Sequence, residues 1–170
     1  MSDYSNKLQE ELREISDLIY DHAGMTFNIS SPKQLGTVLF EKMQIAKPKL
    51  TKTKSYSTGE EELMKLINKH PIINQILEYR SINKLISTYV DVLPTLVNAG
   101  TGLLPPSFNQ IVTATGRLSS SNPNLQNIPI RDDRGKVIRS AFIASDDEHI
   151  FLSADYSQIE LRVMAQLSQD

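Results

Sequence analysis

The sequence predicts an α+β chain that is predominantly helical. Apolar residues recur at intervals of three and four over most of the first hundred residues, which is the period of amphipathic helices. A run rich in Gly and Asn then interrupts this pattern near residue 98, and short apolar runs typical of strands follow it. We therefore expect a helical subdomain over residues 1–97 and a second subdomain over 98–170 that contains short antiparallel strands and one helix.

The composition bounds what the chain can do. Its 170 residues are 39% hydrophobic, which is enough for a real core, and 18 Lys and Arg against 20 Asp and Glu give a net charge of -2. This balance excludes a uniformly basic coat, so any site for a polyanion must be local. The chain has no Cys, and its three His are too scattered to predict zinc. It shows neither a leader peptide nor a run near the roughly 20 apolar residues of a membrane span, so we expect a soluble protein of the cytoplasm without a membrane partner.

Two amphipathic helices open the chain. The first covers 7–22, with its apolar positions at intervals of four, three and four, and it should close near Gly24. Ser31 and Gln34 form a capping-box pattern with Pro32 at the first helical position, which predicts a second helix at about 32–43.

A basic, mobile loop over 47–59 should separate these helices from the next two. It carries Lys47, Lys49, Lys52 and Lys54. A second capping-box pattern from Thr58 to Glu61 then predicts a helix that stops before Pro71. A longer helix is expected over 72–97, kinked or ended by Pro94.

The second half alternates between strands and turns. Residues 108–114 have the period of a strand, and 115–131 read as an ordered polar loop. Strands are expected over 138–144 and 150–154, followed by a helix that opens at Ser157. Its inward face should carry Ile159, Val163 and Leu167.

Asp155 follows an apolar run at the point where this last helix begins. A carboxylate at the end of a strand can hold Mg²⁺ through its oxygens. A lone Asp is more often a helix-start residue than a metal ligand, and Glu160 completes a capping-box pattern that begins at Ser157. Spacing alone does not choose between these interpretations.

The segment 113–131 forms the second candidate. It contains Arg, Ser, Asn and Gln but no acidic residue, a set of donors suited to phosphates, sugars and base edges. The same composition also suits a loop that is merely solvated.

Together the two segments resemble the family A DNA polymerases. The resemblance is carried by Thr-Gly-Arg-Leu-Ser-Ser at 115–120, Pro-Asn-Leu-Gln-Asn-Ile-Pro at 123–129 and Asp-Tyr-Ser-Gln-Ile-Glu-Leu-Arg at 155–162, in this order. It extends upstream through 29–35 and 77–80, and so covers nearly the whole chain. It implies that 1–97 is the thumb and 98–170 the N-terminal part of the palm of an enzyme that extends a primer under template direction.

The resemblance implies a role for several residues near the last helix. Asp155 would be a catalytic carboxylate that binds two Mg²⁺ ions, with the carbonyl of Tyr156 as a further metal ligand. Glu160 would be a residue of the catalytic site, a steric gate whose side chain excludes nucleotides that carry a ribose 2′-hydroxyl. Tyr156, Gln158 and Glu160 would lie at the incoming deoxynucleoside triphosphate, and Arg162 would be an ion-pair partner within the palm.

The same resemblance assigns the polar loop to primer–template duplex DNA. Arg117 would lie in the minor groove at the primer terminus, where every correct base pair presents acceptors. The contacts would be extended by Asn124, Gln126, Asn127 and Arg131. The lysines of the 47–59 loop would hold the DNA backbone at the tip of the thumb, although such a loop is also typical of a solvated surface.

The sequence departs from the family in two respects. Leu103 to Phe108 stand where the family usually has a basic residue and then His-Thr before Ser-Phe, and the missing backbone donors of Pro105 and Pro106 put strand pairing there in doubt. The fingers helix for the triphosphate and a second palm carboxylate are also missing from these 170 residues, so we expect no nucleotidyl transfer by this chain alone. The alternatives are a non-catalytic duplex-DNA-binding module and a helical interaction protein. An unpaired strand edge before Asp155 would also permit a dimer.

Overall fold

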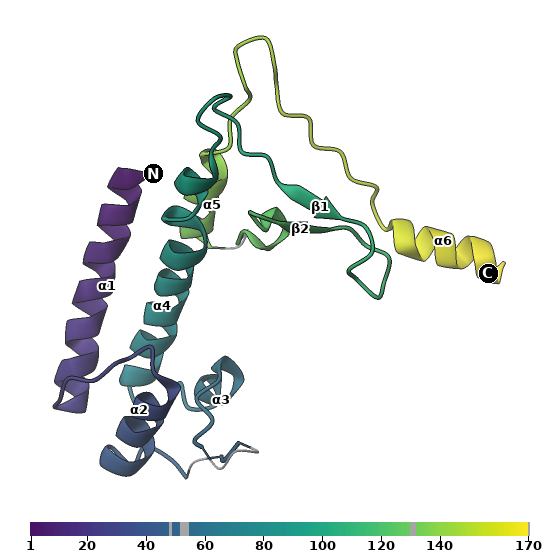
Figure 1. The fold of residues 1–170 in the computed structure, drawn as a ribbon. Coiled ribbons are helices and arrows are strands. Elements are labelled where there is room, and N and C mark those ends of the chain that lie inside the picture. The colour runs from purple at the N-terminus through teal and green to yellow at the C-terminus, as the bar shows by residue number, and fades with distance from the viewer. Residues whose placement is uncertain (48, 52–54, 130–131, 170) are drawn as a thin grey trace.

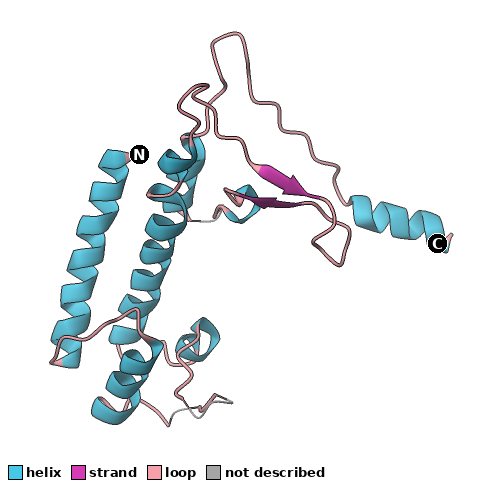
Figure 2. Cartoon of the chain, viewed as in Figure 1, coloured by secondary structure: helices cyan, strands magenta, loops and turns pink. Residues whose placement is uncertain are grey.

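A computed structural model describes residues 1–47, 49–51, 55–129 and 132–169 (Figures 1 and 2). Three of the predicted DNA-binding residues, Lys52, Lys54 and Arg131, lie outside these ranges. In chain order the elements are α1 (Ser2–Ala23), α2 (Pro32–Gly36), η1 (Thr37–Lys42), α3 (Glu60–Met64), α4 (Ile72–Leu85), η2 (Ile86–Val90), η3 (Leu93–Leu96), β1 (Ser107–Asn109), β2 (Ser119–Ser121), η4 (Leu125–Asn127), α5 (Asp133–Ser140) and α6 (Ile159–Ser168). The described residues are therefore mostly helical and contain one small antiparallel sheet, which agrees with the predicted fold class. None of the helices in the described ranges is long and apolar enough to cross a membrane.

The first two helices confirm the periodic pattern. α1 starts five residues earlier than expected and ends at Gly24, which adopts the left-handed conformation with φ 65°. It lies beside α4 (Figure 1), and its apolar stripe buries Leu8 and Ile19. Ser31 caps α2 by accepting a hydrogen bond from the Gln34 backbone N–H, and the helix then widens into the π-helical turns of η1.

The capping box predicted at Thr58 is not formed. The N-cap of α3 is Gly59, and no side chain caps that helix. The Thr58 side chain is buried, and its hydroxyl accepts a hydrogen bond from the Arg80 guanidinium at 3.3 Å. Arg80 also donates to the Thr58 carbonyl, so this threonine joins α3 to α4 instead of starting a helix.

The long helix expected over 72–97 ends near residue 90. α4 continues as the π-helical η2, and η3, which contains Pro94, follows as a separate 3-10 turn. A proline without a backbone N–H suits the first turn of a new helix better than the interior of a long one.

The apolar residues form two core clusters along the α1–α4 pair. The cluster near the α2 end is made of Ile19, Ile29, Leu35, Leu39, Phe40, Leu63, Ile72, Ile73 and Ile76. The cluster near the other end is made of Leu8, Ile82, Leu85, Ile86, Tyr89, Val90, Leu93, Ile128 and Ile138. Because Ile128 and Ile138 belong to the second cluster, residues beyond 98 share a core with α1 and α4.

The sheet is smaller than expected and differently placed. β1 covers only the start of the predicted strand 108–114, and it pairs with β2 so that Ser107 faces Ser121 and Asn109 faces Ser119. β2 lies within the segment predicted as a loop. Three consecutive serines carry no apolar alternation, so the sequence pattern gave no sign of this strand.

The strand predicted over 138–144 is wrong. Residues Asp133–Ser140 form α5, which begins with the Asp132 side chain accepting a hydrogen bond from the Arg134 N–H. Within this helix only Gly135 and Ile138 are buried, one helical turn apart. A short apolar run does not distinguish a helix from a strand, and here the packing of Ile138 into the core decides for the helix.

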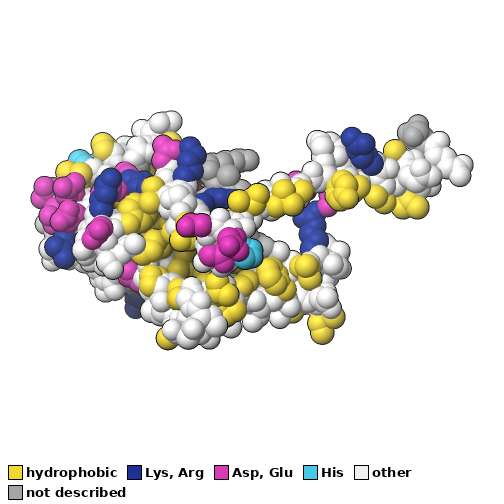
Figure 3. Space-filling view, turned by 90° about the horizontal axis from the view of Figure 1, so that it is seen from above, with side chains coloured by type: hydrophobic (Ala, Val, Ile, Leu, Met, Phe, Trp, Pro, Cys, Tyr) yellow, Lys and Arg dark blue, Asp and Glu magenta, His cyan; other side chains and the backbone are white. Residues whose placement is uncertain are grey.

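The last segment forms an extended arm that ends in α6 (Figure 1). Residues 150–154 are extended, but they form no strand within the described part of the chain. α6 buries no residue: Ile159, Val163 and Leu167, the predicted inward face, are 45%, 50% and 80% exposed. Figure 3 shows apolar side chains gathered along this arm, away from the rest of the molecule.

Candidate nucleic-acid interface

Arg117 lies on the connection between β1 and β2. The connection turns at Gly116, whose φ of 72° is in the left-handed region that favours glycine. The Thr113 hydroxyl donates a hydrogen bond to the Arg117 carbonyl, which fixes the backbone at this position. The guanidinium itself is largely exposed, with 70% of the side chain accessible.

Arg117 forms an ion pair with Glu160 on the first turn of α6. The two residues are 43 positions apart in the sequence, and both side chains are exposed. Glu160 therefore turns towards the β1–β2 connection and does not complete a capping box, because the N-cap of α6 is Gln158 and it makes no side-chain cap. The pair places the two sequence-predicted segments next to each other.

The side chains of Asn124 and Gln126 are engaged within the protein. Gln126 donates from Nε2 to the Leu118 carbonyl at 2.8 Å, and its Oε1 accepts from the Ser120 N–H at 3.2 Å. The Oδ1 of Asn124 accepts from the Gln126 N–H at 3.1 Å. By contrast, Asn127 is exposed and has no side-chain hydrogen bond to any residue in the described ranges.

A cavity of about 300 Å³ lies next to Asn127, between α3, α4 and the turn at Pro129. Its wall includes Arg80 and Lys84, which are four residues apart on α4. Burial lowers the pKa of Arg80, whose guanidinium is held by Thr58. Lys84 was not among the predicted interface residues. The sequence could have indicated Lys84, because it follows Arg80 by four residues and so lies on the same face of the helix.

The described lysines of the 47–59 loop differ from each other. Lys49 donates to Glu62 on α3 at 3.1 Å, and Lys65 donates to the same carboxylate at 2.8 Å. These hydrogen bonds, first from Lys65 and then from Lys49, hold the pKa of Glu62 below its ordinary value. Lys47 is exposed and forms no ion pair with the part of the chain that the structure describes.

Asp155, Tyr156 and Gln158 all lie exposed on the arm. Gln158 adopts a left-handed conformation with φ 54° and starts α6. Arg162 donates from Nε to the Ser157 carbonyl at 3.0 Å, so within the described ranges it does not form the predicted ion pair. Asp155 has no side-chain partner among the described residues.

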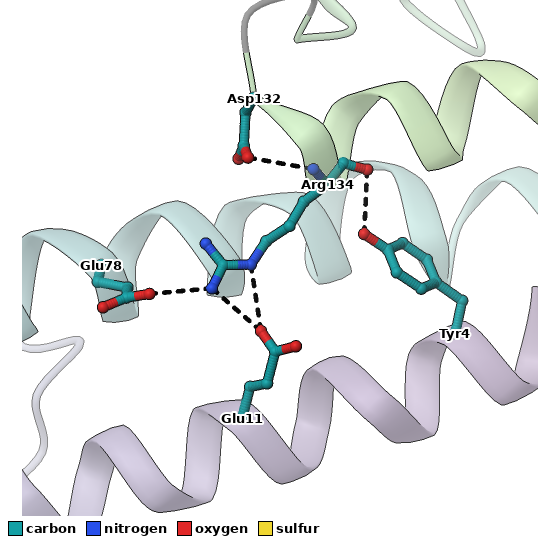
Figure 4. A network of polar contacts seen from close by, with 5 residues as sticks. All are labelled: Tyr4, Glu11, Glu78, Asp132 and Arg134. Carbon is teal, nitrogen blue, oxygen red and sulfur yellow. Dashed lines mark hydrogen bonds and ion pairs between the residues drawn. The ribbon is translucent and has the colours of Figure 1, made fainter.

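A network around Arg134 holds α5 against the two long helices (Figure 4). Its guanidinium donates to Glu11 on α1 at 3.1 Å and to Glu78 on α4 at 2.9 Å, and the Tyr4 hydroxyl donates to the Arg134 carbonyl at 3.0 Å. Partial burial acts to lower the pKa of Arg134, but the hydrogen bonds to Glu78 and Glu11 outweigh it and raise that pKa. The network thus holds α5 against the helical half of the molecule.

Comparison with known proteins decides the family. The model for DNA polymerase family A matches residues 1–170. The chain belongs to DNA polymerase family A. Its relatives in this family include DNA polymerase I of Synechocystis sp., 56% identical over 167 residues that are 98% of this chain and 17% of that protein. DNA polymerase I of Geobacillus stearothermophilus is 51% identical over 164 residues, which are 96% of this chain and 19% of that protein.

The structural comparison agrees with the family A assignment. The solved POL domain of Pol1 from M. smegmatis, in complex with DNA primer-template and dNTP, matches with a TM-score of 0.85 at 40% identity. The match covers 99% of this chain and 30% of that chain. The family A chain described here therefore corresponds to part of a DNA polymerase I polymerase domain and spans less than a fifth of the length of the two DNA polymerase I relatives.

Family A polymerases use Mg²⁺, and the described residues do not by themselves fit this ion. Magnesium prefers octahedral coordination by oxygen ligands. In the described ranges no group of three or more His, Cys, Asp or Glu side chains could hold a metal, and Asp155 lies alone on the arm.

Proposed function

We propose that this chain is the thumb, residues 1–97, and the N-terminal part of the palm, residues 98–170, of a DNA polymerase I. The intact protein would work in the cytoplasm, where it would extend a primer under template direction from deoxynucleoside triphosphates in DNA replication and repair. The similarity to the M. smegmatis domain, solved in complex with DNA primer-template and dNTP, supports this proposal over 99% of the chain.

The ion pair between Arg117 and Glu160 is the observation that carries the proposal. It joins the segment proposed for the primer terminus to the segment proposed for the incoming nucleotide. In this proposal Arg117 enters the minor groove, and Glu160 and Gln158 contact the nucleotide. Asn127, Arg131 and the lysines of the 47–59 loop add contacts along the duplex. Asp155 and the Tyr156 carbonyl are proposed as this chain's share of a magnesium site whose other ligands lie elsewhere in the polymerase domain.

We expect the chain alone to bind duplex DNA without extending it. Catalysis of nucleotidyl transfer depends on charges fixed around the reacting phosphate, and Asp155 alone does not provide them. A primer-extension assay with the purified chain checks this expectation. Extension of a labelled primer beyond the buffer control would contradict it.

Fluorescence anisotropy tests the binding role. A labelled primer–template duplex is titrated with wild type and with Arg117→Ala at two salt concentrations. Wild type should bind more weakly at the higher salt, and Arg117→Ala should weaken binding by about five- to tenfold, with a salt slope shallower by about one.

The matched control for this titration is Arg13→Ala. Arg13 is an exposed arginine on α1, which lies on the opposite side of the molecule from α6 (Figure 1). The Arg13→Ala variant should bind the duplex like wild type. Salt-insensitive binding by wild type, or equal losses in the two variants, would refute the proposed role.

A further inference from the structure

The polar loop after Arg117 contains a hydrogen-bonded brace made by Gln126 and Ser120. We propose that Gln126 is a positioning residue that orients Arg117 through this brace, and that it is not itself a ligand of the duplex. This inference rests on the proposed function of Arg117. It differs from the role that the resemblance implies for Gln126, which is direct contact with DNA.

The side-chain amide of Gln126 closes one edge of β2. It donates to the Leu118 carbonyl at 2.8 Å and accepts from the Ser120 N–H at 3.2 Å. Residues two apart in a strand present their backbone groups on the same edge, so one amide can satisfy both groups as a neighbouring strand would. Leu118 directly follows Arg117, and the brace holds the two peptide bonds from Leu118 to Ser120, one residue beyond the arginine.

Ser120 holds the other side of the brace. This residue is only 4% exposed, and its hydroxyl accepts from the Leu125 N–H at 2.9 Å and lies 3.4 Å from the Asn124 Oδ1. The Asn124 Oδ1 in turn accepts from the Gln126 N–H at 3.1 Å. The turn that carries Gln126 is thus tied back to the strand that Gln126 braces.

These bonds hold the backbone that follows Arg117, while its guanidinium lies at the surface in an exposed ion pair with Glu160. Thr113 fixes the Arg117 carbonyl from the other side, whereas the guanidinium is largely exposed. A cation presented on an ordered backbone loses less conformational entropy when it binds. The Gln126 Oε1 and one Nε2–H are already engaged, so using this amide to grip DNA would break the brace that presents the arginine.

The salt dependence of binding distinguishes positioning from direct contact. Glutamine carries no charge and releases no counterion itself, so Gln126→Ala changes the salt slope only if it displaces an arginine. We expect Gln126→Ala to weaken binding of the labelled primer–template duplex by about three- to tenfold, with a shallower slope like that of Arg117→Ala. In the Arg117→Ala background the same substitution should cost little more, because both act on one contact.

Asn127→Ala is the matched control. It removes an amide that takes no part in the brace and that the proposed function places directly on the duplex, so it should weaken binding but leave the salt slope unchanged. Amide hydrogen exchange of the free protein gives a second measurement: the Ser120 N–H should exchange faster in Gln126→Ala than in wild type. Ser120→Ala, which removes the hydroxyl that holds Leu125, serves as a second variant and should shift binding in the same direction.

The outcomes separate this inference from the proposed function. Suppose that wild type binds with a steep salt slope. The positioning role is then overturned, and the proposed function stands, if Gln126→Ala leaves that slope unchanged. The same conclusion follows if the loss of affinity in Gln126→Ala adds in full to the loss in Arg117→Ala. Unchanged exchange of the Ser120 N–H in Gln126→Ala overturns the brace. If wild type does not bind the duplex, the proposed function and the inference fail together.

Discussion

A single arginine connects three helices that are far apart in the sequence. Arg134 on α5 contacts Glu11 on α1 and Glu78 on α4, at positions separated by 123 and 56 residues (Figure 4). Its side chain is only 30% exposed, so solvent screens these ion pairs less than it screens the pairs on the arm. One guanidinium thus ties α5 to both long helices.

Arg134→Ala should lower the free energy of unfolding by about 1–2 kcal/mol, because Glu11 and Glu78 lose a partly buried partner. Urea denaturation followed by circular dichroism measures this loss. Arg139→Ala is the control, since Arg139 lies exposed on the same helix without an ion pair among the described residues, and it should stay within about 0.5 kcal/mol of wild type. Equal effects of the two variants would show that the network does not stabilise the fold.

Glu160→Gln should strengthen duplex binding by about two- to fivefold. Glu160 neutralises Arg117 in the free chain, and an exposed ion pair contributes less than about 1 kcal/mol, which sets the size of the gain. Anisotropy titration without nucleotide measures it. Glu148→Gln makes the same charge change at an exposed loop residue, so a gain of the same size there would assign the effect to net charge alone.

At the scale of an element, α5 is seated on the preceding turn through a glycine. A Cβ placed on Gly135 would lie 2.8 Å from the Pro129 Cβ and 2.9 Å from its carbonyl carbon, closer than real Cβ contacts. The helix therefore approaches the end of the polar segment more closely than any other residue would allow. This approach accounts for a glycine within a helix, where it is ordinarily unfavourable.

Gly135→Ala should destabilise the protein by about 1–3 kcal/mol, because the backbone at Pro129 must move. On an exposed helix the same change would stabilise by about 1 kcal/mol, so the sign is diagnostic. Thermal and urea unfolding measure it. Gly100→Ala is the control, since a Cβ there meets only the end of the Asn98 side chain at 3.4 Å. Increased stability in Gly135→Ala would contradict the close packing of α5.

Acidification should break the hydrogen bonds that Lys65 and Lys49 donate to Glu62. Hydrogen bonds from Lys65 and Lys49 lower the folded-state pKa of Glu62, so their stabilising effect is present above the unfolded-state pKa and is lost as the pH falls through the folded-state value. A carboxyl ¹³C titration should find the pKa of Glu62 below its ordinary value in wild type and closer to that value in Lys65→Ala. An identical titration in both proteins would exclude this ion pair.

At the scale of the whole molecule, the two ends of the fold differ in how much they bury. α1 and α4 share two core clusters, whereas the arm exposes Ile150, Phe151 and Leu152 at 87%, 69% and 88% (Figure 3). Exposed apolar groups in such a run mark a surface that normally meets other protein. This agrees with a chain that spans only part of a polymerase domain.

Hydrogen exchange should be fast throughout α6 and slow in α1 and α4. A ten-residue helix without a buried residue gains little from packing and is marginal in water. Exchange followed by mass spectrometry on the purified chain measures this contrast. Protection of α6 equal to that of α4 would contradict it.

The helical half could largely be predicted from the sequence, and the second half could not. The period of Leu8 and Ile19 determines α1 because one of its faces is buried. The apolar run around Ile138 wrongly predicted a strand, because the burial of Ile138 depends on α1 and α4, more than 40 residues away. The candidate site could also be predicted only in part. The motifs indicate Arg117 and Glu160, but the ion pair between them and the Gln126 brace depend on tertiary contacts that the sequence does not show.

The shared core of α1 and α5 has a consequence for synthesis on the ribosome. Leu8 lies in one cluster with Ile138, and the Tyr4 hydroxyl meets a carbonyl 130 residues further along the chain. At about 5–20 residues per second, α1 emerges on the order of ten seconds before α5. During that interval α4 covers most of the apolar stripe of α1, but the cluster around Leu8 still lacks Ile138, so this end of the core closes only after α5 has been synthesised.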